Sequence, residues 1–185
     1  MLRELVVRNR SYRRFYQETV VELDTLKELV DLARLSASGG NRQALKYILC
    51  RDPEKNAAIF PHIGLAGSPR EGERPSAYII ILGDTEISRD FGVDYGIAAQ
   101  SILLGATEKG LGGCMVGMID RNALRKTLGI PSRYEVLLVL AMGRPKEEAV
   151  IDTVGEDGNT GGWWDDQGVH HVPKRPLDDI IVAQY

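Results

Sequence analysis

Cysteine is almost missing from this sequence, which has only Cys50 and Cys114 among its 185 residues. Two distant cysteines in apolar surroundings do not make a disulfide framework, so we expect a reducing compartment, the cytoplasm. An apolar run of about 18 residues is also missing, and the first residues contain no apolar stretch of signal-peptide length. We therefore expect neither a membrane segment nor an export signal.

The chain also lacks an excess of positive charge. Its formal net charge is -3, and its pI is near 5.7. Binding to a phosphate backbone requires a broad basic surface, so nucleic acid is not expected as a partner. There is no internal repeat and no low-complexity tract. With 43% hydrophobic and 26% charged residues, the composition is that of a globular protein, and we predict a single domain over residues 1–185.

Several familiar catalytic patterns are absent as well. The chain has neither a G-x-S-x-G nucleophile elbow nor a Walker A sequence. The glycines of "KGLGGCMVG" (109–117) follow a predicted helix, whereas dinucleotide-binding glycines follow a strand and open a helix. His170 and His171 are adjacent and would face opposite ways in an extended segment, with no C-x-x-C pair nearby. No metal site is predicted.

What is present is a pattern of helices and short strands. Helical spacing of apolar residues predicts helices over 25–35, capped by Asp24 or Thr25, and over about 91–109, stopped by Gly110. The second is apolar on nearly all sides, which indicates burial in a core or a subunit interface. Another short helix is predicted over 121–128, with Asp120 as its cap and Gly129 after it.

Three apolar runs are predicted as strands, namely 45–50, 76–84 and 134–143. The isoleucine-rich run 76–84 is typical of a central strand buried on both faces. After Pro145 the composition becomes polar and irregular. The interleaved order of helices and strands predicts a mixed α and β class with a sheet of few strands.

Four arginines are concentrated in "RNRSYRRF" (8–15). In an extended segment Ser11 and Arg13 share one side, and arginine and serine together suit an anion such as phosphate. Charge pattern alone favours a solvated basic segment instead. Likewise, "SASGGNRQ" (36–43) is either a helix-ending loop or a close approach to a ligand by small residues, with Asn41 and Gln43 as polar partners. Trp163 and Trp164 fit local packing and a lid equally well.

Four segments taken together resemble the nitroreductase family: "RSYRRF", "SASGGNRQ", "DYGIAAQSILLGATEKGLGGC" and "VPKRPLDDII". The resemblance lies in their order and spacing along nearly the whole chain. It implies an α+β, nitroreductase-like fold, with a small mostly antiparallel sheet flanked by helices and a long buried helix at the dimer interface. Asn9 stands where many relatives carry another arginine, and Ala37 replaces a common proline.

The resemblance also implies FMN as cofactor, in homodimers with FMN sites at the subunit interface. Arg10 and Ser11 would hold the FMN phosphate, with Lys174 and Arg175 completing that site, and Arg13 would lie beside the N1 edge of the flavin ring. Loop residues would line the flavin from the partner subunit or nearby, and the backbone at Val116 and Gly117 would meet the ring near N5. The full predicted set is Arg10, Ser11, Tyr12, Arg13, Ser38, Gly39, Asn41, Gln43, Val116, Gly117, Lys174 and Arg175.

The function implied is an FMN-dependent oxidoreductase that passes electrons from NADH or NADPH to a nitroaromatic, quinone or similar small acceptor with ping-pong kinetics. The cofactor carries the chemistry, so no side chain is predicted to be catalytic. Alternatives are a flavin-binding or redox-sensing module with little turnover and a specialised flavin reaction such as reductive dehalogenation. Either residues 56–74 or the Trp163-Trp164 loop would cover the substrate pocket.

Overall fold

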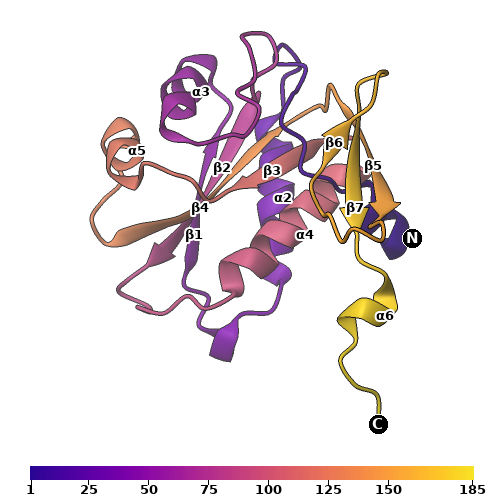
Figure 1. Cartoon of the computed structure of the whole chain (residues 1–185). Helices are drawn as coiled ribbons and strands as arrows, with labels where there is room; N and C mark the ends of the chain where they lie inside the picture. The colour runs from indigo at the N-terminus through magenta and orange to yellow at the C-terminus, as the bar shows by residue number, and fades with distance from the viewer. The chain divides into compact units, whose positions relative to one another are not determined.

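The computed structural model describes residues 1–185 and divides the chain into two compact units, Met1–Lys146 and Glu147–Tyr185. None of its helices combines the length and the apolar character needed to cross a membrane. The first unit contains a four-stranded sheet with helices on both faces (Figure 1). The second contains a separate three-stranded sheet.

The sheet of the first unit is antiparallel throughout and has the order β1-β2-β4-β3. Its strands are β1 (Leu45–Cys50), β2 (Ala77–Asp84), β3 (Gly112–Val116) and β4 (Tyr134–Gly143). Every residue of β2 is buried, as predicted for a central strand. The predicted bounds of β1 and β4 are confirmed, whereas β3 was not predicted, because its two glycines weaken the strand pattern.

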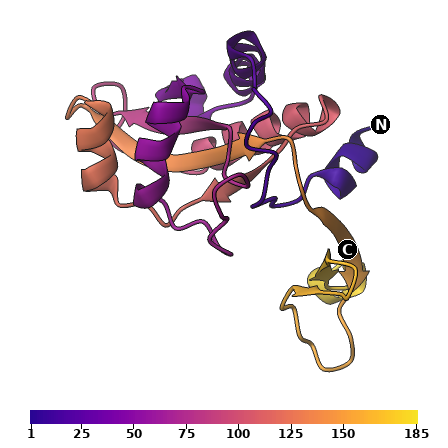
Figure 2. The ribbon, with the colours of Figure 1, turned by 90° about the horizontal axis from the view of Figure 1, so that it is seen from above.

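Helices cover both faces of this sheet, and each face has its own apolar cluster. α2 (Leu23–Leu35) and α4 (Asp94–Glu108) pack on the face that contains Ile79 and Ile81. α3 (Pro53–Ile59) and α5 (Arg121–Leu128) pack on the opposite face, against alternate residues of the same strands. Figure 2 shows α2 and the pair α3 and α5 on opposite sides of the sheet. A short helix α1 (Leu2–Arg8) and two single turns, Gly39–Asn41 and Phe60–His62, complete the unit.

The predicted ends of α5 and the predicted stop of α4 are confirmed. Asp120 accepts a hydrogen bond from the backbone N–H of Ala123 at 3.0 Å and begins α5, and Gly129 ends it with a φ of 62°. Gly110 likewise follows α4 with a φ of 72°. For α2 the predicted cap was wrong: Glu22 occupies the N-cap without a side-chain hydrogen bond, and Asp24 lies inside the first turn.

Within one chain, α4 is not buried on all sides. Ala98, Ala99, Ile102 and their neighbours face α2 and the sheet, but Val93 just before the helix is 72% exposed and Ile97 is 39% exposed. Gly105 allows the close packing on α2, because a Cβ there would lie 2.3 Å from Leu32 Cδ1. The apolar residues on its other side therefore have no cover inside this chain.

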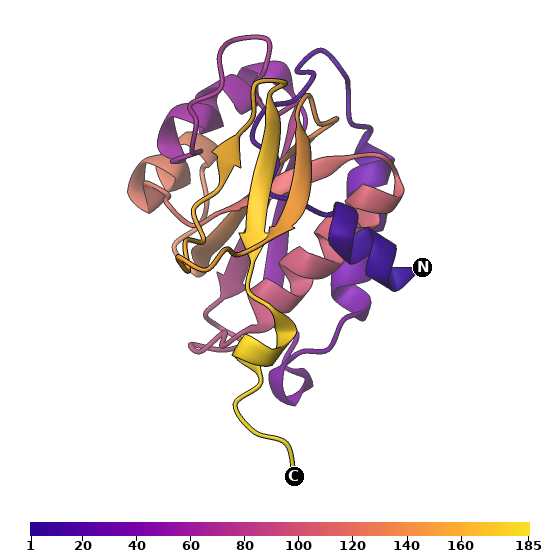
Figure 3. The ribbon, with the colours of Figure 1, turned by 45° about the vertical axis from the view of Figure 1, so that its right-hand side comes forward.

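The second unit corrects the expectation of an irregular C-terminal region. β5 (Glu148–Thr153) pairs in parallel with β7 (Val169–Lys174), and β6 (Trp163–Trp164) pairs antiparallel with the other edge of β7. Figure 3 shows β7 between the other two strands, followed by α6 (Leu177–Ile180). Composition did not reveal these strands because they are short, polar and joined by Gly- and Asp-rich loops.

Candidate functional site

The arginine-rich segment is held to the ends of two strands. Ser11 forms a parallel bridge with Gly113 of β3, and the N–H of Tyr12 donates to Gly113 O at 3.1 Å. Further along, the N–H of Lys146 donates to Arg14 O at 2.9 Å, just beyond β4. The segment is thus extended, as the anion-site interpretation requires, and its backbone is fixed.

Two side chains anchor this segment. Phe15 is fully buried, and a Cβ on Gly143 would approach its ring to 3.1 Å. The Tyr12 ring packs over Gly112, where a Cβ would approach it to 2.4 Å. Any larger residue at position 112 would displace Tyr12, so this glycine is required by the close approach of the segment to β3.

Arg10 is the residue whose environment fits an anion best. Its Nη2 donates to Val6 O at 2.6 Å, whereas its Nε is buried without a hydrogen-bond partner. Burial lowers the pKa of Arg10, although a guanidinium remains charged at neutral pH. A buried donor without a partner costs free energy, and an anionic ligand would satisfy both its charge and its N–H. The residues present therefore fit a bound phosphate.

Arg13 lies on the same stretch as Ser11, and its Nη1 donates to Ser11 O at 3.2 Å. The structure thus brings Arg10, Ser11, Tyr12 and Arg13 together beside the first residues of β3. Val116 and Gly117 lie at the other end of that strand. Since a strand rises about 3.3 Å per residue, Val116 lies roughly 10 Å along β3 from Gly113.

The turn after β3 is tied to the segment before β2. The N–H of Gly64 donates to Met118 O at 2.7 Å, and Ile63 forms an antiparallel bridge with Ile119. A Cβ on Gly64 would come within 2.9 Å of Met118 Cβ. A Cβ on Gly117, in contrast, would have no neighbour within 4 Å, so the backbone there is open to approach by a ligand.

The predicted loop Ser38–Gln43 is held by Asp94, a residue that the sequence did not single out. The N–H of Gly39 donates to both carboxylate oxygens of Asp94, at 2.9 Å and 3.1 Å. Asn41 and Gln43 have φ values of 53° and 52°, a conformation that non-glycine residues rarely adopt. Ser38, Gln43 and Asp94 line a cavity of about 200 Å³. Asp94 and the two positive-φ residues therefore fix the backbone of this loop, which is more than a simple helix ending requires.

This loop and the arginine segment lie at opposite ends of α4. Asp94 is the first residue of the helix, whereas Arg8 Nη2 donates to the carbonyl of Thr107, near its last residue, at 3.4 Å. A helix of 15 residues is about 22 Å long. One chain therefore does not bring Ser38, Gly39, Asn41 and Gln43 next to Arg10.

The remaining predicted residues, Lys174 and Arg175, belong to the second unit, at and just after the end of β7. In that unit Trp163 stacks on His171 and Trp164 stacks on His170, with ring centroids 4.0 Å and 4.1 Å apart. These stacks favour local packing over a lid as the role of the two tryptophans. The two histidines are adjacent residues of one strand, so they face opposite ways, as predicted.

Comparisons with known proteins show the family of this chain. The sequence model of the Nitroreductase family matches residues 6–77 and 73–144. An Archaeoglobus fulgidus protein provisionally named NADH dehydrogenase/NAD(P)H nitroreductase is 30% identical over 156 residues, which covers 78% of this chain and 86% of the relative. The chain belongs to the nitroreductase family.

Solved structures support the same family and fold. An FMN-dependent nitroreductase from Clostridium difficile R20291 is 27% identical with a TM-score of 0.67, covering 78% of this chain and 87% of that one. A nitroreductase family protein from Streptococcus pneumoniae TIGR4 is 16% identical, covers 100% of both chains and has a TM-score of 0.76. The predicted family and the α+β nitroreductase-like fold are confirmed; the dimer stays a prediction.

Proposed function

We propose that this chain is an FMN-dependent oxidoreductase that takes electrons from NADH or NADPH and passes them to a nitroaromatic, quinone or similar small acceptor. Its family and the names of its relatives support flavin oxidoreductase chemistry. The observation that carries the proposal is the buried, unpartnered Nε of Arg10 on a segment fixed against β3. Bound FMN would supply the hydride and electron transfer.

The residues of the chain then bind and orient the cofactor. Arg10 and Ser11 hold the phosphate, because a guanidinium and a hydroxyl both donate to phosphate oxygens. The proposal includes Lys174 and Arg175 as further phosphate contacts, and a single FMN-binding domain over residues 1–185. The ring of Tyr12, packed on Gly112, sets the spacing between the arginine-rich segment and β3.

Arg13 acts at the ring end. Reduction of a flavin places negative charge near N1, and a guanidinium at that edge stabilises this charge. The backbone of Val116 and Gly117 approaches the ring near N5, which the open space around Gly117 permits. No side chain is needed as a nucleophile.

The protein works as a homodimer. The loop that contains Ser38, Gly39, Asn41 and Gln43 is about the length of α4 away from Arg10 in the same chain, which supports a contribution to the partner's flavin. The exposed side chains of Val93, just before α4, and Ile97, within it, support the same arrangement. We place the protein in the cytoplasm, in keeping with its two buried cysteines, which form no disulfide.

The visible spectrum of the purified protein tests this proposal. We expect the absorption of oxidised flavin, and bleaching after anaerobic addition of NADH or NADPH. Double-reciprocal plots of initial rate against acceptor concentration, at several nucleotide concentrations, should be parallel, as ping-pong kinetics require. A flavin spectrum that neither nucleotide bleaches would favour the binding or sensing module. A colourless protein that does not bind added FMN would refute the proposal.

A further inference from the structure

One segment of the first unit, residues 64–74, connects the two ends of the proposed flavin site, and we call it the strap. At one end, the N–H of Gly64 donates to Met118 O at 2.7 Å, one residue after the proposed contact with flavin N5. At the other end, the N–H of Phe15 donates to Glu73 O at 2.9 Å, two residues after the arginine proposed at the N1 edge. The strap therefore runs between these two parts of the site.

Much of the strap between its two ends is exposed. The N–H of Ser68 donates to Leu65 O at 3.2 Å, and Leu65 is buried, so this turn is anchored. A Cβ on Gly67 or on Gly72 would have no neighbour within 4 Å. The space beside these two glycines is open, so a ligand can approach the strap there.

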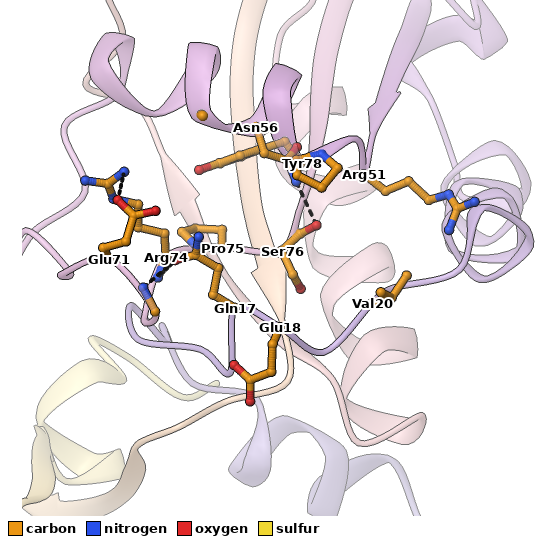
Figure 4. Close-up of a pocket in the computed structure, with 13 residues that line it drawn as sticks. Gln17, Glu18, Val20, Arg51, Asn56, Glu71, Arg74, Pro75, Ser76 and Tyr78 are labelled. Atoms are coloured by element: carbon orange, nitrogen blue, oxygen red, sulfur yellow. Dashed lines mark hydrogen bonds and ion pairs between the residues drawn. The ribbon is translucent and has the colours of Figure 1, made fainter.

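The second end of the strap is held by the side chain of Gln17. Its Oε1 accepts hydrogen bonds from the N–H of Gly72 at 2.8 Å and from the N–H of Arg74 at 3.1 Å. Figure 4 shows Gln17 beside Arg74 and Pro75. An amide oxygen has two lone pairs, so it can satisfy both N–H groups at once. One side chain that follows the arginine-rich segment thus fixes two backbone groups of the strap.

A larger cavity, of about 530 Å³, adjoins this end of the strap, between the start of α3 and the beginning of β2. Gln17, Gly72 and Arg74 line it, together with Asn56 and Tyr78 (Figure 4). Residues that border open space are not held by packing from that side. The two hydrogen bonds of Gln17 therefore matter more for the position of the strap than they would in a close-packed region.

We propose that Gln17 is a positioning residue, and that the strap it holds borders the space in which the nucleotide and the electron acceptor meet the flavin. This inference rests on the proposed oxidoreductase function. β3 and the arginine-rich segment border the proposed flavin site on the side of the sheet, whereas most strap residues are exposed to solvent. Gln17 acts on the two substrates only through the strap.

Steady-state kinetics of Gln17→Leu with bound FMN test this role. The variant loses both hydrogen bonds, so we expect the KM for the nucleotide and the KM for 1,4-benzoquinone to rise about fivefold, with kcat changed less than about twofold. FMN affinity should be unchanged, because the arginine-rich segment keeps its own bridge to β3.

Two further variants make this test specific. Gln17→Glu keeps an oxygen acceptor at the same position, so it should restore both KM values to those of the wild type. Gln167→Leu is the matched control, since Gln167 is an exposed glutamine of the second unit. It should leave both KM values unchanged.

Amide hydrogen exchange tests the two hydrogen bonds directly and does not depend on flavin. We expect the amides of Gly72 and Arg74 to exchange about tenfold faster in Gln17→Leu than in the wild type and in Gln17→Glu. The amides of β2 should keep their rates in all three proteins, which shows that the variants are folded.

Three results would overturn the proposal. Equal exchange rates at Gly72 and Arg74 in the wild type and in Gln17→Leu would show that Gln17 does not hold the strap. Faster exchange with unchanged KM values would show that the strap does not border the substrates. A raised KM that Gln17→Glu does not restore would mean that the oxygen of Gln17 is not its cause. A wild-type protein that binds no FMN would instead refute the oxidoreductase function, and the exchange rates tell the two failures apart.

Discussion

Arg10 differs from the other arginines of the N-terminal segment in its buried, unpartnered Nε. We predict that Arg10→Ala weakens FMN binding about tenfold to a hundredfold, because a hydrogen bond to a charged group contributes about 1.5–3 kcal/mol. Arg10→Lys should recover part of the affinity, since lysine keeps the charge but loses the planar donors. Flavin fluorescence quenching measures the affinity.

Arg34→Ala is the control for this change, because Arg34 is an exposed arginine on α2 whose Nε contacts Asp31 at 2.6 Å. Its loss should leave FMN affinity unchanged. Equal affinity of wild type and Arg10→Ala would show that Arg10 does not hold the phosphate.

His171 is the residue with a distinctive titration. Its pKa is raised above the ordinary value, first by the hydrogen bond between Nδ1 and Asp152, at 2.7 Å, and also by Asp165. A raised folded-state pKa means that this stabilisation is complete below the unfolded pKa of about 6.5 and is lost as pH rises through the folded pKa. We predict that the second unit becomes less stable over that pH interval.

Tryptophan fluorescence can follow this titration, because Trp163 stacks on His171. The emission of the wild type should change with a midpoint above about 6.5, and Asp152→Asn should lower that midpoint. His171→Gln should abolish the transition. A midpoint unaffected by Asp152→Asn would contradict the assigned cause.

At the scale of elements, Asp94 connects the start of α4 to the predicted flavin-binding loop that contains Gly39. It begins α4 and holds Gly39 by two hydrogen bonds. We predict that Asp94→Ala lowers FMN affinity about tenfold while unfolding free energy falls by only about 1 kcal/mol, because the lost hydrogen bonds are exposed. Flavin binding and denaturant unfolding measure the two effects separately.

Asp24→Ala is the matched control, since Asp24 is also an acidic residue in the first turn of a helix and contacts Lys27 on the surface. It should cost similar stability and no FMN affinity. Comparable losses of affinity in both variants would mean that the effect of Asp94 is only on helix stability.

How far the sequence predicts each element depends on local pattern. β1 and β4 are continuous apolar runs between clear turn residues, and their predicted bounds match. β3 contains Gly112 and Gly113, and glycine is disfavoured in strands, although here Gly112 admits the Tyr12 ring and Gly113 packs closely against Leu103 and Ala141. β5 and β7 pair in parallel across an intervening loop and strand, and no local pattern encodes that pairing.

In the candidate site, too, some features follow from local sequence pattern and others only from tertiary contacts. Order and spacing of four segments were enough to indicate the family and the residues beside β3. The tie between Gly39 and Asp94 joins residues 55 positions apart, and the cavity around Asn56 and Tyr78 depends on how α3 packs on β2. Such contacts follow from tertiary packing, so the sequence alone did not indicate them.

At the scale of the whole molecule, the single chain leaves apolar residues uncovered, and the proposed flavin site would need residues that lie far apart in one chain. Ile97 of α4 is 39% exposed, and the loop at the start of the same helix lies far from Arg10. A second copy related by a twofold axis can cover the apolar residues and supply the loop. We predict that Ile97→Glu shifts the protein from dimer to monomer, because a buried charge without a partner is costly.

Sedimentation at a series of concentrations measures the dimer, and flavin content is recorded on the same samples. Ile87→Glu is the control, since Ile87 is a similarly exposed isoleucine, 45%, outside α4. If Ile97→Glu remains dimeric with full FMN, α4 does not form the interface. If it becomes monomeric yet binds FMN with wild-type affinity, the Ser38–Gln43 loop does not act on the partner's flavin. Loss of both together is the outcome expected when each flavin is bound by two chains.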